Sequence, residues 1–146
     1  MPYEPFAAGE TITAEKMRTR FTEIIMDWTP LASLGSFASG FSANPGMAPA
    51  MQIVREMGVV QWRYQGRINN ATPSSLSNTT TTMFTFASTD HRPIAERGMS
   101  AYASSSAHYP VRLGLMVSGN LTGSVPTAGG GAATIWLDGF VITNPR

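Results

Sequence analysis

The sequence contains no cysteine, few charged residues and no long apolar run. The lack of cysteine excludes a disulfide framework and a thiolate metal site, so the stability of the fold has to come from packing. No stretch reaches the roughly 18 consecutive apolar residues of a membrane-spanning helix. The first ten residues have neither the basic start nor the apolar core of a signal peptide. We therefore expect no membrane insertion and no export signal.

Charge is scarce in the whole chain. Charged residues make up 13% and hydrophobic residues 42% of the 146 residues, whereas soluble proteins average about 25% charged residues. The surface must then consist largely of Ser, Thr, Asn and Gly, and a partner subunit must bury part of the apolar area. This composition favours self-association. The net charge is +1 and the basic residues are scattered, so we expect no nucleic acid partner.

The first 29 residues predict an extended arm followed by one short helix. Two prolines and a glycine indicate an extended arm over residues 1–12. Thr13 is a suitable N-cap, and Pro30 ends the helical pattern. Between them, apolar residues recur at alternating spacings of three and four, which is the pattern of an apolar helical seam. The residues of this seam are Ala14, Met17, Phe21, Ile24 and Trp28.

This seam has two interpretations. It can join copies of the chain, or it can pack the helix against its own domain, because a sustained coiled coil needs about three to four heptads and this pattern covers fewer. Both remain open on the sequence. We expect residues 1–29 to form an attachment and oligomerisation segment and residues 30–146 to form a β domain.

After residue 30 the composition shifts to Gly, Pro, Ser and residues that favour strands. In residues 58–68, apolar and polar side chains alternate, which predicts a strand with Trp62 and Tyr64 on its apolar face. Asp138-Gly139 predicts a tight turn or a bulge within the last strand. Six or more short strands favour a mainly β fold, a β-sandwich or jelly roll. The other strand candidates are residues 51–57, 83–87, 99–103, 111–119 and 134–143.

Two connections are predicted to be exposed loops. Residues 69–82 contain eleven Ser, Thr or Asn residues in fourteen positions, and residues 122–131 are rich in glycine. Long polar loops on a rigid β scaffold often carry binding residues. They can equally be mobile connections without a binding role. The sequence leaves both readings open.

No catalytic, metal or cofactor site is predicted. A Gly-x-Ser-x-Gly nucleophile motif is absent, and residues 35–40 lack the lysine of a phosphate-binding loop. His91 and His108 are the only histidines, too few for a metal site with several ligands. The acidic residues fall in separate predicted elements, so no pair is set up for glycoside cleavage. We therefore expect a protein that is not an enzyme.

Aromatic residues provide a further candidate binding site. An exposed Tyr or Trp ring can stack on the face of a sugar ring. Trp62 and Tyr64 lie on the apolar row of their strand, so we assign them to the core. Tyr102 and Tyr109 flank a Ser-rich turn and are predicted to be an exposed pair that contacts glycan. Trp136 is a further aromatic candidate.

Several segments together resemble phage tail-fibre and minor tail proteins. These are GETITAEKM at residues 9–17, GVVQWRYQGRI at 58–68, STDHRPIAERGMSAYA at 88–103, VRLGLMVSGNLTG at 111–123 and IWLDGFVIT at 135–143. Each phrase is short, but their order and spacing match over most of the chain. The third segment keeps only Arg92-Pro93 of its usual pattern.

The resemblance implies a phage virion structural protein that is assembled in the host cytoplasm. It implies a β-sandwich domain, a homotrimer, and an N-terminal arm that docks on other virion proteins. A capsid head fibre or decoration protein is the alternative within this class. The alternative of another class is a carbohydrate-binding module that reads host-surface glycan through Tyr102, Tyr109 and residues 69–82.

Overall fold

The structure is a computed structural model that describes residues 7–11, 13–104, 108–125 and 133–146, without the side chains of residues 17–20, 108 and 109. One helix, α1 (Ala14–Phe21), precedes the strands. The strands are β1 (Thr22–Pro30), β2 (Gly35–Phe37), β3 (Phe41–Ala43), β4 (Ala50–Glu56), β5 (Val59–Gln65), β6 (Arg67–Asn70), β7 (Thr81–Phe86), β8 (Arg97–Ser104), β9 (His108–Leu115), β10 (Asn120–Ser124), β11 (Thr134–Trp136) and β12 (Val141–Thr143). Short 3₁₀ turns are η1 (Leu31–Ser33), η2 (Pro73–Ser75) and η3 (Thr89–His91).

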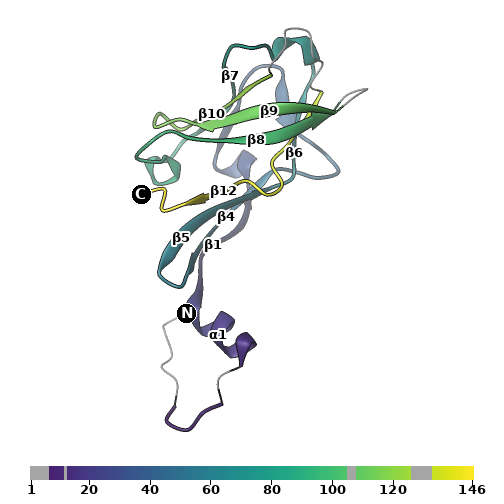
Figure 1. Ribbon diagram of the computed structural model, residues 1–146. Helices are drawn as coiled ribbons and strands as arrows, with labels where there is room; N and C mark the ends of the chain where they lie inside the picture. The colour runs from purple at the N-terminus through teal and green to yellow at the C-terminus, as the bar shows by residue number, and fades with distance from the viewer. Residues whose placement is uncertain (1–6, 12, 105–107, 126–132) are drawn as a thin grey trace.

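The strands form two antiparallel sheets (Figure 1). One is four-stranded, in the order β1-β4-β5-β12, and the other is eight-stranded, in the order β2-β7-β10-β9-β8-β11-β6-β3. The two end strands of the larger sheet, β2 and β3, are consecutive in the chain. The turn between them is tied to both sides, because the Ala38 N–H donates to the Met83 carbonyl and the Ala71 N–H to the Gly40 carbonyl. The sheet therefore curls into a nearly closed barrel, which confirms the mainly β prediction.

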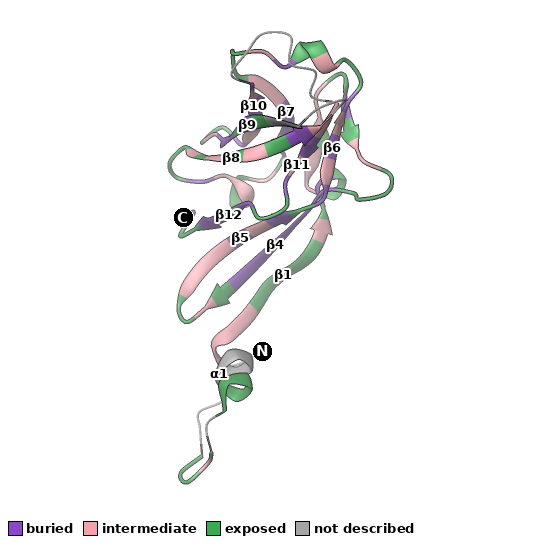
Figure 2. Ribbon diagram, turned by 45° about the vertical axis from the view of Figure 1, so that its right-hand side comes forward, coloured by how far each residue is buried: buried purple, intermediate pink, exposed green. Residues whose placement is uncertain are grey.

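The core lies between the two sheets, and alternation along the strands fills it (Figure 2). The predicted apolar row of residues 58–68 is confirmed: Trp62, Tyr64 and Ile68 are buried in the core. The Tyr64 and Phe140 rings stack with centroids 4.9 Å apart. Burying each large apolar side chain contributes about 1.5–3 kcal/mol. Because the row spans β5 and β6, it contributes to the packing of both sheets.

The chain crosses between the sheets at one corner. Gly66 separates β5 from β6 and has a φ of 84°, in the left-handed region that favours glycine. Its N–H donates to Asp138 Oδ1 at 2.9 Å, and its carbonyl accepts from the Leu137 N–H at 2.9 Å. Asp138-Gly139 itself forms the turn between β11 and β12, with Gly139 at a φ of 82°. Both strand pairs thus change sheet at the same place.

The prediction of a helix up to residue 29 is wrong after Phe21. Thr13 does cap the helix, since its Oγ1 accepts from the Lys16 N–H at 3.2 Å. From Thr22, however, the chain forms β1, and Ile24 lies opposite Val54 of β4. Pairing with β4 supplies hydrogen bonds and cross-strand contacts to a segment rich in β-branched residues, and these outweigh the helical spacing. No helix among the described residues is long and apolar enough to cross a membrane.

The five residues predicted as one helical seam therefore do not form one. Ala14 and Phe21 belong to α1, whereas Ile24 and Trp28 lie on β1. The side chain of Met17 lies outside the described part of the chain. Ile24 and Trp28 are nevertheless exposed on the strand. Whether these residues join copies of the chain stays a prediction.

The two predicted loops are exposed only in part. Leu76 is fully buried and anchors residues 69–82 to the core, and the ends of this segment belong to β6 and β7. Residues 122–124 belong to β10, which pairs with both β7 and β9 and satisfies their backbone groups. Residues 126–131 lie outside the described ranges. The polar composition of these segments did not predict that Leu76 would be buried or that residues 122–124 would pair as a strand.

Replacing Gly66 with alanine should destabilise the protein strongly. A Cβ there would lie 2.3 Å from the Ala48 carbonyl oxygen, in addition to the strained φ. We expect a loss of about 3 kcal/mol or more in the free energy of unfolding, measured by urea titration. The matched control is Gly58→Ala, since Gly58 has a φ of 82° but open space around its Cβ position. Its expected loss is about 1 kcal/mol, and equal losses would contradict the steric argument.

Tyr64→Phe should stabilise the protein. The Tyr64 hydroxyl is buried without a hydrogen-bond partner in the described residues, and burial raises the pKa of Tyr64 far above its usual range. Removing an unpaired buried hydroxyl should raise the free energy of unfolding by about 1 kcal/mol. Tyr102→Phe, at an exposed position, should leave it unchanged. A loss of stability in Tyr64→Phe would show that the hydroxyl has an acceptor.

Candidate functional site

The candidate site lies on the outer surface of the eight-stranded sheet, over β8, β11 and β6. Ala103, Ile135 and Ile68 of these neighbouring strands are buried in the core. Because successive side chains of a strand point to opposite faces, their sequence neighbours face outward. The outward residues are Tyr102 and Ser104 on β8, Thr134 and Trp136 on β11, and Arg67 and Asn69 on β6.

Strand register places two aromatic residues side by side on this surface. Thr134 lies opposite Ser104. Trp136 follows Thr134 by two residues and Tyr102 precedes Ser104 by two, so in an antiparallel pair both project from the same face of adjacent strands. Tyr102 is 67% exposed. Its predicted exposure is therefore observed, while its contact with glycan stays a prediction.

Arg67 and Trp136 form a stacked pair next to Tyr102. They are opposite each other in the register of β6 and β11, and the Arg67 guanidinium carbon lies 3.9 Å from the centroid of the Trp136 ring. This distance is well within the range of a cation–π interaction. The Arg67 Nε–H and the Trp136 Nε1–H are buried without an acceptor in the described part of the chain. The stack thus has hydrogen-bonding capacity that the protein does not use.

The loop between β3 and β4 holds Asn69 and the backbone of Arg67 in place. Asn44 Oδ1 accepts from the N–H groups of Gly46 and Met47, both at 3.0 Å. The Asn44 Nδ2 donates to Asn69 Oδ1 at 2.9 Å. The backbone of Arg67 is bonded on both sides, from its N–H to the Met47 carbonyl at 2.8 Å and from the Asn44 N–H to its carbonyl at 3.0 Å. Arg67 and Asn69 are therefore held by a rigid support.

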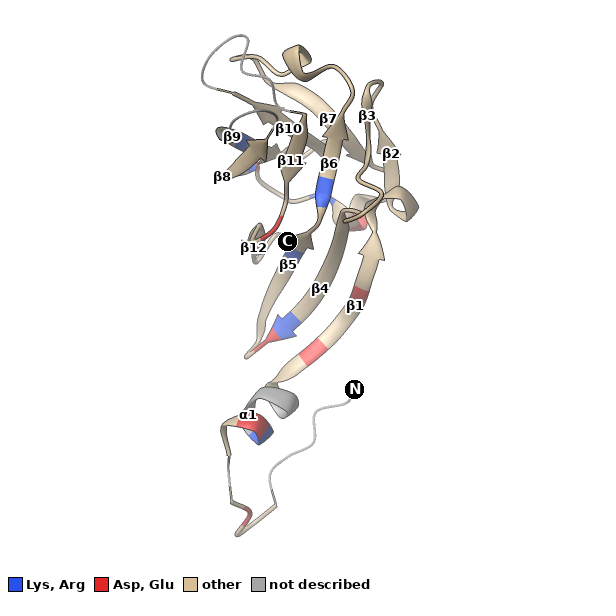
Figure 3. Ribbon diagram, turned by 90° about the vertical axis from the view of Figure 1, so that its right-hand side faces the viewer, with Lys and Arg blue, Asp and Glu red and all other residues tan. Residues whose placement is uncertain are grey.

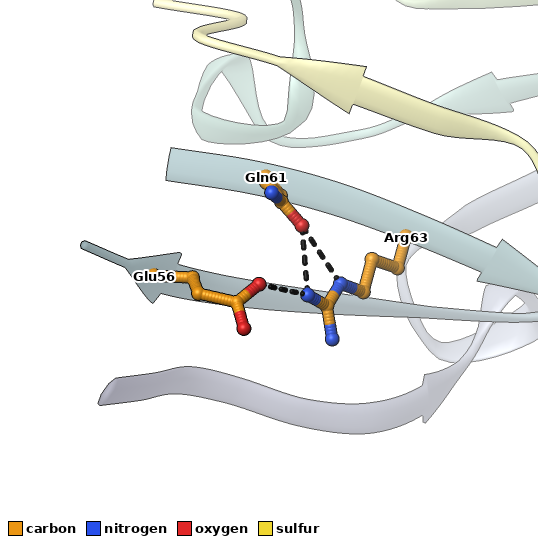
Figure 4. Close-up of polar contacts among 3 residues, drawn as sticks. All are labelled: Glu56, Gln61 and Arg63. Atoms are coloured by element: carbon orange, nitrogen blue, oxygen red, sulfur yellow. Dashed lines mark hydrogen bonds and ion pairs between the residues drawn. The ribbon is translucent and has the colours of Figure 1, made fainter. Parts of the chain in front are cut away.

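The charge of Arg67 is not neutralised. Among the described residues Arg67 forms no ion pair, and β6 carries a single basic band in Figure 3. Arg63 on β5 is different, because its Nη2 lies 2.7 Å from Glu56 Oε2 and 2.8 Å from Gln61 Oε1 (Figure 4). Arg63 is thus engaged within the chain, whereas Arg67 retains an uncompensated positive charge on the outer surface.

The other candidate residues from the sequence lie away from this surface or have side chains that the structure does not describe. Tyr109 pairs with Ala103 through its backbone, but its side chain and that of His108 are not described. Of residues 69–82, the structure places Asn69 on the same surface as Tyr102. Asp138 accepts a hydrogen bond from Gly66 and holds the corner between the sheets. No three His, Asp or Glu side chains within the described ranges come together in a way that could hold a metal ion.

His91 belongs to a loop that contacts the C-terminal residues. Its ring lies against Phe86, with centroids 5.9 Å apart. Burial lowers the pKa of His91, and the nearby Asp90 carboxylate partly opposes this shift. Arg146 pairs with Asp90 at 3.7 Å, and Arg97 donates to the Asn144 carbonyl at 3.1 Å. These contacts join residues 88–97 to the end of the chain and involve neither Tyr102 nor Trp136.

Sequence reasoning missed Arg67 and Asn44 as members of this surface, and it included Asn69 only as the first residue of the segment 69–82. The alternation in residues 58–68 does place Arg67 on the polar face of its strand, which was the available signal. Its neighbours Trp136 and Tyr102 are far away in the sequence, and pairing of β6, β11 and β8 brings them together. The result is an exposed aromatic ring, a guanidinium and an amide on one surface, a combination suited to binding hydroxyl-rich ligands.

Two solved structures of phage proteins have a fold similar to this one. The receptor-binding protein of Listeria phage PSA has a TM-score of 0.55 and 17% identity, over 86% of this chain and 66% of that protein. The head domain of lactococcal phage bIL170, described among receptor-binding domains, has a TM-score of 0.53 and 20% identity, over 82% of this chain and 97% of that domain. No family model and no curated protein matches the chain. The shared fold confirms the resemblance found in the sequence.

Removing the Arg67 side chain should expose the Trp136 ring. In a Trp28→Phe background the remaining indoles are Trp136 and Trp62, and Trp62 is buried. Because the guanidinium covers one face of Trp136, Arg67→Ala should increase quenching of tryptophan fluorescence by acrylamide. Arg112→Ala, which removes an exposed arginine from β9 of the same sheet, is the control. Equal quenching in both variants would show that the stack does not shield the ring.

Proposed function

We propose that this chain is a receptor-binding module of a phage tail, and that the outer surface around Tyr102 binds glycan of the host. The observation that carries the proposal is the exposed Tyr102 ring beside the Arg67–Trp136 stack. The fold supports it, because the two similar structures are receptor-binding proteins of phages. The module would act as a virion protein, and no catalytic step belongs to the proposal.

The chemistry of the surface suits a sugar. The face of a tyrosine ring packs against the C–H groups of a pyranose, while hydroxyl oxygens of the sugar accept from nearby N–H donors. The Arg67 guanidinium, which stacks on Trp136, carries several N–H donors of this kind. The rigid support from Asn44 lowers the entropy lost on binding, because Asn69 is already held in place.

Self-association and attachment complete the proposal. We expect copies of the chain to associate, as a homotrimer, with the N-terminal segment attached to other virion proteins. Two observations support this: α1 projects beyond the strands (Figure 1), and Ile24, Ile25 and Trp28 are exposed on β1. Large apolar side chains on an edge strand favour pairing with another surface.

Glycan binding is tested by substitutions at Tyr102. Tyr102→Ala should weaken binding to an array of bacterial cell-wall polysaccharides at least tenfold, equivalent to about 1.4 kcal/mol. Tyr102→Phe should keep most of the affinity, because it retains the ring. Ile94→Ala, at an exposed residue of the loop after η3, is the control and should bind as the unchanged protein does.

Three outcomes would contradict the proposal. Unchanged affinity of Tyr102→Ala would place glycan binding elsewhere. Absence of binding to every polysaccharide on the array would favour a purely structural role in the particle, as in a head fibre. Release of soluble sugar from the polysaccharides would show an enzyme.

A further inference from the structure

A row of polar side chains runs beside the aromatic residues of the candidate site. Asn69 on β6 lies opposite Ser42 on β3 and opposite Thr134 on β11. Thr134 lies in turn opposite Ser104 on β8. Ser42 is exposed, and the other three are partly buried. Because residues opposite each other project from the same face of a sheet, these four side chains share the outer surface with Tyr102, one two-residue step along the strands.

Two backbone N–H groups fix the orientation of the Asn44 side chain. Its Oδ1 accepts from the N–H groups of Gly46 and Met47, both at 3.0 Å. An amide nitrogen has only donors, so it cannot take the place of this oxygen. The Asn44 Nδ2 is therefore directed to the other side, where it donates to Asn69 Oδ1 at 2.9 Å.

The orientation of Asn44 in turn fixes that of Asn69. Only the Asn69 oxygen can accept from the Asn44 Nδ2, so the Asn69 NH₂ group occupies the opposite end of its amide. Among the described residues, the Asn69 Nδ2 donates to no acceptor, and this atom is not buried. Asn69 therefore presents N–H donors to the outer surface.

A glycan that contacts Tyr102 can also reach Asn69. Neighbouring strands are about 4.8 Å apart, and two residues along a strand span about 7 Å. β8, β11 and β6 lie side by side (Figure 3), so Tyr102 and Asn69 are two strands and one two-residue step apart. Their backbone positions are then roughly 12 Å apart. This separation exceeds one sugar ring and fits an oligosaccharide that lies diagonally across the three strands.

We propose that Asn69 is a specificity-determining residue of the glycan site and that Asn44 is its positioning residue. The Asn69 Nδ2 donates to an oxygen of a sugar unit next to the one that packs on Tyr102. A sugar with an acceptor oxygen at this point is selected over one with an amino group there, because the amino protons would face the donors of Asn69. The inference rests on the proposed function and adds to it a second contact and the kind of group that is recognised.

Asn44→Asp tests the positioning while it keeps the loop contacts. A carboxylate still accepts from the N–H groups of Gly46 and Met47, but it cannot donate to Asn69. The Asn69 amide should turn its Nδ2 towards the carboxylate and present its oxygen to the glycan. On the array of bacterial cell-wall polysaccharides, we expect the affinity for the polysaccharide that the unchanged protein binds most tightly to fall at least tenfold.

Asn120→Asp is the matched control. It makes the same change of charge on β10 of the same sheet. Asn120 Oδ1 accepts from the Thr85 Oγ1 at 3.0 Å, a contact that a carboxylate keeps. Its affinity for the same polysaccharide should equal that of the unchanged protein, and urea unfolding checks that each variant folds.

A double variant separates positioning from a direct effect of the new charge. Asn69→Ala alone should weaken binding at least tenfold. Asn44→Asp added to Asn69→Ala should cause no further loss, because Asn44 acts through Asn69. A further tenfold loss would overturn the positioning role.

Nuclear magnetic resonance gives a direct measurement of the Asn69 side chain. Its amide resonances are those that disappear in Asn69→Ala. Addition of an oligosaccharide fragment of the same polysaccharide should shift these resonances in the unchanged protein and leave them in place in Asn44→Asp. Resonances that stay in place in the unchanged protein would overturn the contact.

The outcomes distinguish the inference from the proposed function. Binding that is lost in Tyr102→Ala but unchanged in both Asn69→Ala and Asn44→Asp would overturn the inference alone. Absence of binding to every polysaccharide, or unchanged affinity of Tyr102→Ala, would contradict the proposed function and with it the inference.

Discussion

The hydrogen bond between the Gly66 N–H and the Asp138 carboxylate holds the corner where two neighbouring strand pairs change sheet. Before the corner, β5 places Trp62 and Tyr64 in the core from the four-stranded sheet. After it, β6 places Ile68 in the same core from the eight-stranded sheet. Arg67, the residue directly after Gly66, is thereby set opposite Trp136. The packing of both sheets and the position of the candidate site therefore meet at this corner, which the hydrogen bond from the Leu137 N–H to the Gly66 carbonyl also holds.

The arginines on the outer sides of the two sheets differ in their partners. Arg67 stacks on Trp136 and keeps its charge without an acidic partner, next to the exposed Tyr102. Arg63 is bound by Glu56 and Gln61 on the outer side of the four-stranded sheet. An uncompensated charge beside an aromatic ring suits a small polar ligand in water, whereas the hydrogen-bonding capacity of Arg63 is used within the chain.

Prediction from the sequence succeeded where the pattern within a single segment is enough to identify the structure. The alternation in residues 58–68 correctly assigned Trp62 and Tyr64 to the core. Asp138-Gly139 was expected to be a tight turn or a bulge, and it forms a turn. The prediction failed for residues 22–29. Ile24 and Trp28 have helical spacing, but the segment pairs with β4, and a short stretch of sequence holds no information on that distant partner. It also missed Leu76 in a polar loop, since burial of one side chain depends on the strands around it.

The sequence by itself determined the mainly β class, the absence of disulfides, the apolar face of β5 and the scarcity of surface charge. These follow from composition and from the two-residue period of a strand, both local properties. Only the tertiary structure decided that β1 is a strand, that the eight-stranded sheet curls into a nearly closed barrel, and that Tyr102, Trp136 and Arg67 share one surface. These features require contacts between segments far apart in the chain, and strand pairing alone sets which of those segments become neighbours.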